Sequence, residues 1–346
     1  MSAAADSNAE MPSDDPGNAI DTSIILATCT RSAMLRVALA SLITQTWSPQ
    51  KPLEIIVVDD ASTDNTAAVL AEFQQASPIP FTILQGHGQG VAAARNLGAA
   101  HARGTWLASF DDDQIALPNW LQELRRLADS TRSSCIGGAL ALQLPEGHTL
   151  ADFGPRARRI LGEHLFGELP TRYDGGSMHP ATNNVLIRRD LFTSLGGYDT
   201  TFTEGGEDKD LFTRAAAAGH TMWYQPYSPA LHIMTPQRLS RANLHWTSLR
   251  IGACDARVYQ RKQPRVAPLK LAAKRLAVTL LRDLPQLLAA RFRNDHTTQL
   301  DLQCSLWYTE GLLRALPAIL GNHPERSRFL RSIDFRTRNG ERPTSS

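Results

Sequence analysis

The chain has 346 residues, of which 42% are hydrophobic and 20% are charged, and its formal net charge is +2. These values are typical of a globular protein with one large domain and an appendage, or with two modest domains. The near balance of charge gives no reason to expect nucleic acid as the main partner.

The first 20 residues are small, polar and acidic, with no Lys or Arg before Arg31. They lack the basic start and apolar centre of a signal peptide. We expect disordered tails over 1–20 and 336–346. No later stretch has the roughly 18 to 20 apolar residues that cross a bilayer, so we expect a soluble chain, at most peripheral to a membrane.

From residue 22, short β-rich segments alternate with helical periods, a pattern typical of βαβ units. Ser62, Thr63 and Asp64 are N-cap candidates for the second helix. The pattern therefore predicts an α/β fold with a mostly parallel sheet flanked by helices. The predicted strands are 23–28, 53–58, 81–86 and 105–110, and the predicted helices are 32–45, 67–73 and 91–102.

Polar side chains follow three of the predicted strands. In an open α/β sheet, ligands bind outside the carboxyl ends of the strands, so these residues should meet at one edge. The first helix opens with neither a Walker-type loop nor a G-x-G-x-x-G loop, so the charge of a bound phosphate would need another partner. The residues are Thr28, Thr30, Arg31, Asp59, Asp60, Asp111, Asp112 and Asp113.

Asp111, Asp112 and Asp113 come directly after an apolar segment. Adjacent like charges repel one another and lose solvation near a core, so a cation should compensate them. Mn²⁺ or Mg²⁺, held by one or two carboxylates and substrate phosphates, would do so. The alternative is a solvated acidic turn or a set of helix caps.

Four blocks resemble, in order and spacing, those of family 2 glycosyltransferases over roughly residues 22–235. They are "SIILATCTR", "EIIVVDDASTDNT", "GVAAARNLGAAHARGTWLASFDDDQIALPNWL" and "NNVLIRRDLFTSLGGYDTTFTEGGEDKDLFTRAAAAGH". The resemblance implies a GT-A fold, a nucleotide-sugar donor and a divalent metal held through an Asp-x-Asp motif. Asp111 and Asp113 are the motif pair, with Asp113 favoured as the metal ligand.

The resemblance also implies roles for other residues. His232 would complete the metal shell, although a lone histidine is more often structural. Asn183 and Asn184 would contact the donor sugar, with a polar strand start as the alternative. The residues where relatives hold the nucleotide are Thr28, Asp59, Asp60, Arg95 and Asp111.

Glu207 and Asp208 lie in the first turn of a predicted helix that ends at Gly219. Carboxylates at a helix N-terminus are favoured in their ionised form, as a general base requires. The alternative is that they only cap the helix. By resemblance, Asp208 is the catalytic base of an inverting transferase and Glu207 binds the acceptor.

A helical extension is expected over 236–335, after a GT-A domain over 21–235. The segment 269–284 predicts an amphipathic helix, and Pro285 predicts a break or a new start. We expect the helical extension to dock onto the catalytic domain or a partner subunit. The alternative is a basic interfacial helix on an anionic membrane. Its apolar stripe is Leu269, Leu276, Leu280 and Leu284.

Cys29, Cys135, Cys254 and Cys304 are far apart and form no C-x-x-C pair. We expect free thiols in a reducing compartment, and hence a cytoplasmic protein, peripheral at the membrane in the alternative above.

The sequence as a whole predicts a metal-dependent inverting glycosyltransferase. It would move one sugar from a nucleotide-sugar, with UDP-sugar as the first guess, to a saccharide or lipid-linked acceptor in polysaccharide or cell-envelope glycan synthesis. The competing hypotheses are a nucleotidyltransferase and a non-catalytic transferase-like scaffold. Donor base and sugar, acceptor, linkage and oligomeric state stay open.

Overall fold

A computed structural model describes residues 20–334, apart from 46, 48–50, 175–177, 204, 264, 322 and 324–326. The tails predicted over 1–20 and 336–346 lie outside the described residues, except for residue 20.

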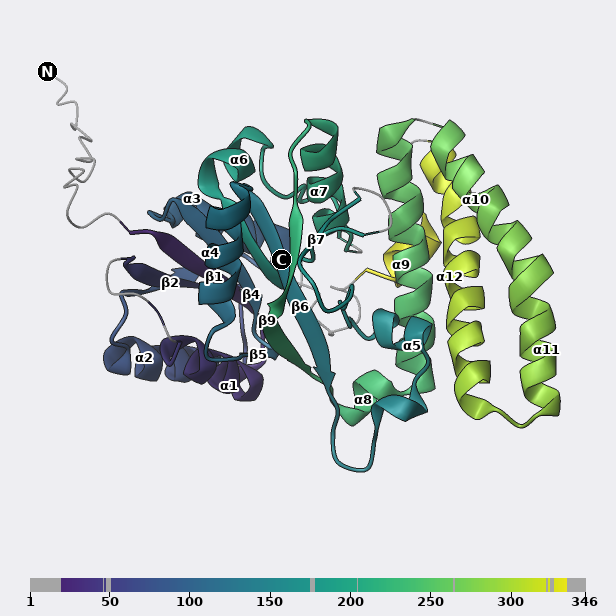
Figure 1. Ribbon diagram of the computed structural model, residues 1–346, viewed down its shortest axis with the longest axis horizontal. Helices are drawn as coiled ribbons and strands as arrows, with labels where there is room; N and C mark the ends of the chain where they lie inside the picture. Colours follow the sequence, from purple (N-terminus) through teal and green to yellow (C-terminus); the bar gives the residue numbers. More distant parts are fainter. Residues whose placement is uncertain are drawn as a thin grey trace, which may run out of the picture.

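One sheet forms the centre of the first part of the chain (Figure 1). Its order is β3-β2-β1-β4-β8-β6-β9-β5, and β7 pairs with β9. The bounds are β1 (Thr22–Thr28), β2 (Leu53–Asp59), β3 (Phe81–Gln85), β4 (Trp106–Asp111), β5 (Gln114–Ala116), β6 (Cys135–Gln143), β7 (Thr171–Arg172), β8 (Asn184–Arg188) and β9 (Trp223–Ile233).

The sheet is parallel from β3 to β4 and mixed beyond β4. β3, β2, β1 and β4 are parallel neighbours. β8 runs antiparallel to both β4 and β6, and β9 is parallel to β6. β5 and β7 run antiparallel to β9. The predicted α/β architecture is confirmed, and its parallel part coincides with the alternating strands and helices of the sequence.

Helices cover both faces of this sheet, which explains why its strands are continuous apolar runs. Ile24 and Leu26 of β1 face the layer of α1, α2 and α4, whereas Ile25 faces the layer of α3, α6 and α7. Successive side chains of a strand point to opposite faces, so both layers gain a core. The bounds are α1 (Ser32–Ile43), α2 (Thr66–Ala76), α3 (Val91–His101), α4 (Trp120–Thr131), α5 (Pro155–Ile160), α6 (Arg189–Ser194) and α7 (Glu207–Ala217), with a short 3-10 turn at Leu150–Asp152.

The predicted caps of α2 differ in detail from the structure. Asn65 occupies the N-cap position without a side-chain bond, while the Asp64 carboxylate accepts hydrogen bonds from the backbone N–H of Thr66 and of Ser32. Asp64 therefore fixes the starts of both α2 and α1. An acceptor that serves two helix termini could not be recognised from either segment alone.

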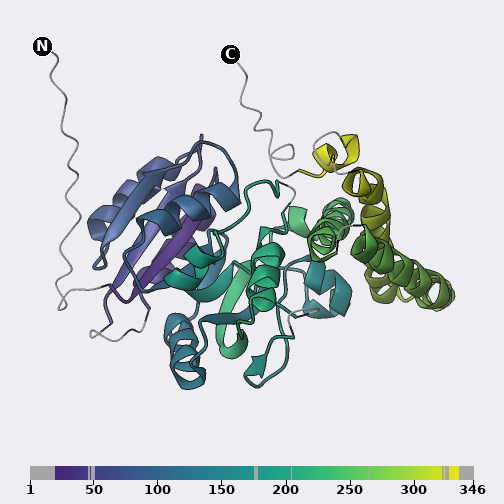
Figure 2. The same cartoon turned by 90° about the horizontal axis from the view of Figure 1, so that it is seen from above.

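Helices continue from residue 236 and lie to one side of the sheet (Figure 1, Figure 2). Met234, Leu244 and Cys304 share a core with Phe153 and Ala157, which joins the extension to α5. α10 and α11 lie at the outer edge, beyond α9 and α12. The bounds are α8 (Pro236–Leu239), α9 (Arg241–Lys262), α10 (Val266–Val278), a π-helical turn (Thr279–Asp283), α11 (Leu284–Phe292), α12 (His296–Leu320) and α13 (Arg328–Ser332).

The predicted amphipathic helix forms, but its apolar stripe faces outward. Leu269, Leu276, Leu280 and Leu284 are 48%, 42%, 53% and 36% exposed. The buried face lies beside this stripe and consists of Pro268, Ala272, Thr279, Asp283, Leu287 and Ala290. Docking of this stripe onto the catalytic domain is therefore wrong, whereas docking onto a partner subunit stays a prediction. The helical run continues through Pro285 without the predicted break, and the π-helical turn lies directly before α11, which carries this proline in its first residues.

α9 and α12 approach closely through two glycines. A Cβ added to Gly252 would overlap the carbonyl oxygen of Tyr308, and one added to Gly311 would overlap that of Leu249. The helix pair therefore depends on the absence of side chains at these positions.

Gly311→Ala should lower the free energy of unfolding by about 1–3 kcal/mol, because the added methyl group forces the two backbones apart. Chemical denaturation measures this change. Lys274→Ala on the exposed surface of α10 is the control and should stay within about 0.5 kcal/mol of wild type. Equal stability of the two variants would contradict the close approach.

Candidate active site

The polar strand ends meet at one edge of the sheet, as the sequence predicts. Thr28 at the end of β1 pairs in register with Asp59 at the end of β2, and Ala27 pairs with Asp111 at the end of β4. A tight turn at Asp112 and Asp113 then leads into β5. Both of these aspartates are buried, whereas the Asp111 side chain is 28% exposed.

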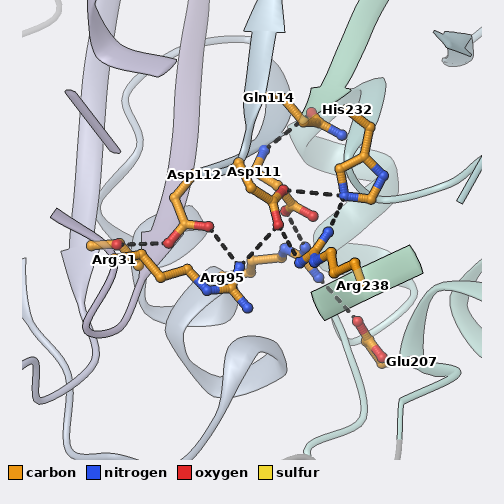
Figure 3. Close-up of polar contacts among 10 residues, drawn as sticks. Arg31, Arg95, Asp111, Asp112, Gln114, Glu207, His232 and Arg238 are labelled. Atoms are coloured by element: carbon orange, nitrogen blue, oxygen red, sulfur yellow. Dashed lines mark hydrogen bonds and ion pairs between the residues drawn. The ribbon is translucent and has the colours of Figure 1, made fainter. Parts of the chain in front are cut away.

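Arg31, just after β1, is the first cation that compensates these acids (Figure 3). Its Nη1 lies 3.0 Å from Asp112 Oδ1 and 3.0 Å from Asp113 Oδ2. The Thr28 hydroxyl donates a further hydrogen bond of 2.7 Å to Asp112 Oδ2. One arginine thus binds two adjacent carboxylates.

Arg95 of α3 joins the acidic turn to the start of α7. Its Nη2 lies 2.5 Å from Asp111 Oδ1, and its Nη1 lies 3.0 Å from Glu207 Oε1. Both Arg95 and Glu207 are buried. Asp111, predicted to bind the nucleotide, and Glu207, predicted to bind the acceptor, therefore contact the same guanidinium (Figure 3).

Arg238 of α8 is the third cation, and it is not among the residues predicted from the sequence. Its Nη2 lies 2.6 Å from Asp113 Oδ2, and its Nη1 lies 2.6 Å from His232 Nε2. Thr235 caps α8 by accepting a hydrogen bond from the Arg238 N–H, which sets the position of this arginine. The available signal was the segment "TPQR" after β9, with a capping Thr and a Pro in the first turn.

Burial and these cations act in opposite directions on the acids. Burial, with Asp113 adjacent, raises the pKa of Asp112 to about 6, although Arg31 opposes this shift. Burial alone would also raise the pKa of Asp113, but His232, Arg238 and Arg31 together hold it below its ordinary value. The attraction of Asp112 raises the pKa of Arg31, so the guanidinium stays charged.

Asp113 and His232 fit a divalent cation as donors. Asp113 Oδ1 is buried without a hydrogen bond, and its contact is His232 Nε2 at 3.5 Å. The Arg238 guanidinium, a positive group, contacts both residues in their present arrangement. Among the residues that the structure describes, no three acidic, His or Cys side chains converge as a metal-binding set. Asp111, the third predicted ligand, instead binds Arg95.

The other predicted nucleotide residues lie beside this turn. Asp59 accepts a hydrogen bond from the Ser62 N–H. The two Asp60 oxygens accept from the N–H groups of Gly88 and Gly90, at 2.8 Å each. Asp60 therefore fixes the loop between β3 and α3, with its carboxylate already bonded to the chain.

Asn183 and Asn184 have different surroundings. Asn184 is buried, and its amide bonds Trp120 Nε1 at 2.7 Å and the carbonyl oxygens of Ala139 and Ser228. The expected contact of Asn184 with a donor sugar does not agree with this placement, because its amide is engaged inside the core. Asn183 is partly buried and its Oδ1 has no hydrogen bond.

The first turn of α7 carries Glu207 and Asp208. Burial and the adjacent Asp208 raise the pKa of Glu207. The Asp208 carboxylate accepts one hydrogen bond, from the Lys209 N–H, in the described part of the chain. Lys209 Nζ in turn lies 2.6 Å from Asp255 Oδ1 of α9, so the extension holds this helix start in place.

The sequence profile described as "Glycosyl transferase family 2" matches residues 23–193, the segment that supplies the acidic turn. Residues 23–193 belong to glycosyl transferase family 2. This confirms the family that the four sequence blocks resemble. Asp208, His232 and Arg238 lie beyond the matched segment.

Several curated relatives are similar to this chain over more than half of its length. Validoxylamine A glucosyltransferase of Streptomyces hygroscopicus subsp. limoneus is 30% identical over 267 residues, which cover 71% of this chain and 57% of the relative. Succinoglycan biosynthesis protein ExoM of Rhizobium meliloti is 29% identical over 233 residues, which cover 66% of this chain and 71% of the relative. The match thus spans little more than half of the first relative.

Solved structures share the fold of this chain. The mannosyltransferase PcManGT from Pyrobaculum calidifontis, in complex with GDP-Man and Mn²⁺, has a TM-score of 0.60 at 16% identity, covering 89% of this chain and 91% of its own. TarS 1-349 of S. aureus has a TM-score of 0.51 at 13% identity, covering 94% and 93%. The predicted GT-A fold is confirmed. In the described residues, no helix has both the length and the apolar character needed to span a bilayer.

Asn184→Ala should cost about 1–3 kcal/mol of unfolding free energy, because the Trp120 N–H and two buried carbonyl groups lose their partner. Asn183→Ala should stay within about 0.5 kcal/mol of wild type. Thermal or chemical denaturation distinguishes the two. A fully stable Asn184→Ala variant would show that this side chain is not part of the core.

Asp112 should make stability depend on pH. In the folded chain the Asp112 carboxyl has a pKa of about 6, above its ordinary value of 3.8. The stability that this bound proton contributes is therefore complete below pH 3.8 and is lost as the pH rises through 6. The unfolding free energy of wild type, relative to Asp112→Asn, should fall between pH 4 and 7 by up to about 3 kcal/mol. A difference that is constant over this range would contradict the assignment.

Proposed function

We propose that this chain is a metal-dependent inverting glycosyltransferase. It moves one sugar from a nucleotide-sugar to a hydroxyl of a saccharide or lipid-linked acceptor, in polysaccharide or cell-envelope glycan synthesis. The observation that carries this proposal is Arg95, which bridges Asp111 and Glu207 and so joins the acidic turn to the helix start that bears Asp208.

The nucleotide would lie against the ends of β1, β2 and β4. Thr28 and Asp59 border this edge, Arg95 and Asp111 close it towards α7, and Asp60 acts by holding the loop at Gly88 and Gly90. Asn183 is the remaining candidate of its pair for the donor sugar. These assignments are supported by the general rule that ligands bind at the carboxyl ends of the strands in an open α/β sheet.

Asp113 and His232 would hold Mn²⁺ or Mg²⁺, with Asp111 as the second motif carboxylate. When bound, the cation would stabilise the negative charge that develops on the departing diphosphate. An oxygen and an imidazole nitrogen suit such an ion, and donor phosphates commonly complete its ligands. Arg238 would have to leave Asp113 for the ion to bind, which would free a guanidinium to face the phosphates.

Asp208 is the proposed general base. It is half-buried in the first turn of α7. It would take the proton from the acceptor hydroxyl, whose oxygen attacks the anomeric carbon on the face opposite the diphosphate, and the configuration inverts. Glu207, held by Arg95, would line the acceptor side.

The donor is proposed to be a UDP-sugar, and UDP-glucose is the first to test because a relative is named a glucosyltransferase. The other relative is named for succinoglycan biosynthesis, which supports an acceptor in polysaccharide synthesis. We propose that residues 21–235 carry catalysis and that 236–335 form the extension. The four cysteines form no disulfide in the described part of the chain, which supports a reducing, cytoplasmic compartment.

Release of nucleoside diphosphate from UDP-, dTDP- and GDP-sugars tests the proposal. One donor should be hydrolysed slowly with Mn²⁺ or Mg²⁺, and EDTA should abolish release. Asp113→Ala should lower release at least about 100-fold, and Asp208→Asn should lower turnover about 10²- to 10⁴-fold while donor binding persists.

Asp129→Asn is the matched control, since this carboxylate is 51% exposed on α4 and pairs with Lys51 and Arg125, not with a residue of the acidic turn. It should behave as wild type. If no donor is hydrolysed or bound with metal present, the scaffold hypothesis replaces this proposal.

A further inference from the structure

The outer face of α10 and α11 carries a continuous row of exposed apolar side chains. Leu281 and Phe292 are 81% and 89% exposed, which is far above the exposure of the other large apolar side chains on this face. We call this row the outer ridge; it consists of Leu276, Leu280, Leu281, Leu284, Leu288 and Phe292. Contiguous apolar surface of this kind marks an interaction site in soluble proteins.

The side chains of the outer ridge lie outside the buried core of the extension. A neighbouring face of the same helix is buried through Ala272, Leu287 and Ala290. It is also fixed by the fully buried Asp283, which contacts Arg156, Arg275 and Arg282 and accepts from the Ser305 hydroxyl. The orientation of α10 and α11 is therefore set by their inner face, and the leucines of the ridge are left on the outside.

Basic residues border the outer ridge. Lys270, Lys274 and Arg291 are exposed, and within the described residues they form no ion pair. Asp283, the acidic residue between 266 and 292, is fully buried and neutralised by arginines. The exposed charge of this helix is therefore positive along its length, which suits an anionic partner.

The shape of the surface favours a flat partner. α10, the π-helical turn and α11 follow one another without interruption at the outer edge of the molecule (Figure 1, Figure 2). A second copy bound through the same ridge would bring two sets of unpaired lysines together. An apolar stripe with a basic border is the pattern of a helix that lies in the interface of a bilayer.

We propose that the outer ridge docks onto a membrane surface rich in anionic lipids. The leucines and Phe292 enter the boundary between headgroups and acyl chains, while Lys270, Lys274 and Arg291 contact the lipid phosphates. The proposal deepens the proposed function, since a lipid-linked acceptor would lie in that surface. Vesicle binding itself requires no catalysis.

Flotation of the full chain with vesicles tests this docking. The chain should float with vesicles of phosphatidylcholine and phosphatidylglycerol, and much less with phosphatidylcholine alone or at high salt. The double variant Leu281→Glu, Phe292→Glu should bind at least about tenfold more weakly. Lys270→Gln with Lys274→Gln should weaken binding to the anionic vesicles about tenfold.

Leu150→Glu, at an exposed leucine outside the extension, is the matched control and should float as wild type does. Circular dichroism verifies folding, and donor hydrolysis, measured without vesicles, should be unchanged in all these variants. The proposal is overturned if wild type does not float with anionic vesicles, or if the ridge variants float equally well. It is also overturned if the ridge variants abolish a dimer that light scattering detects in wild type.

Discussion

The arrangement of the whole site depends on the compensation of three consecutive carboxylates at the end of a buried strand. Asp112 and Asp113 are buried, and like charges so close together would be unstable without cations. Arg31, Arg95 and Arg238 come from three separate parts of the chain and meet at this turn. The charge requirement therefore links the first strand end, α3 and α8 around one point.

This network joins the two sides on which a transfer reaction depends. Arg95 reaches from Asp111 to Glu207, and Lys209 continues the connection from α7 to Asp255 of α9. The extension thus takes part in placing Asp208, while its outer helix remains free for another surface. In our account the arginines compensate the acids before the donor arrives, and the metal with its diphosphate takes over part of that role.

Most of the fold can be predicted from the sequence. Strands that are covered on both faces appear as short apolar runs, and helices with one buried face show apolar residues at helical spacing. Asp111, Asp113 and Asp208 could be selected because they stand at strand and helix ends. Arg238 was not selected, because its partner Asp113 is 125 residues away along the chain and the capping pattern at Thr235 indicates only the start of α8. The binding of the Asn184 amide by Trp120 could not be seen from a position at a strand start, and periodicity shows which residues of α10 share a face, not which way that face points.

The most direct test of the central claim is electron paramagnetic resonance of Mn²⁺ in the presence of UDP, on wild type, Asp113→Ala and Arg238→Gln. The account predicts that nucleotide-dependent Mn²⁺ binding is lost in Asp113→Ala. In Arg238→Gln it should be kept or strengthened, because a competing guanidinium is removed. Mn²⁺ binding to Asp113→Ala with wild-type affinity would contradict the exchange of arginine for metal at this carboxylate.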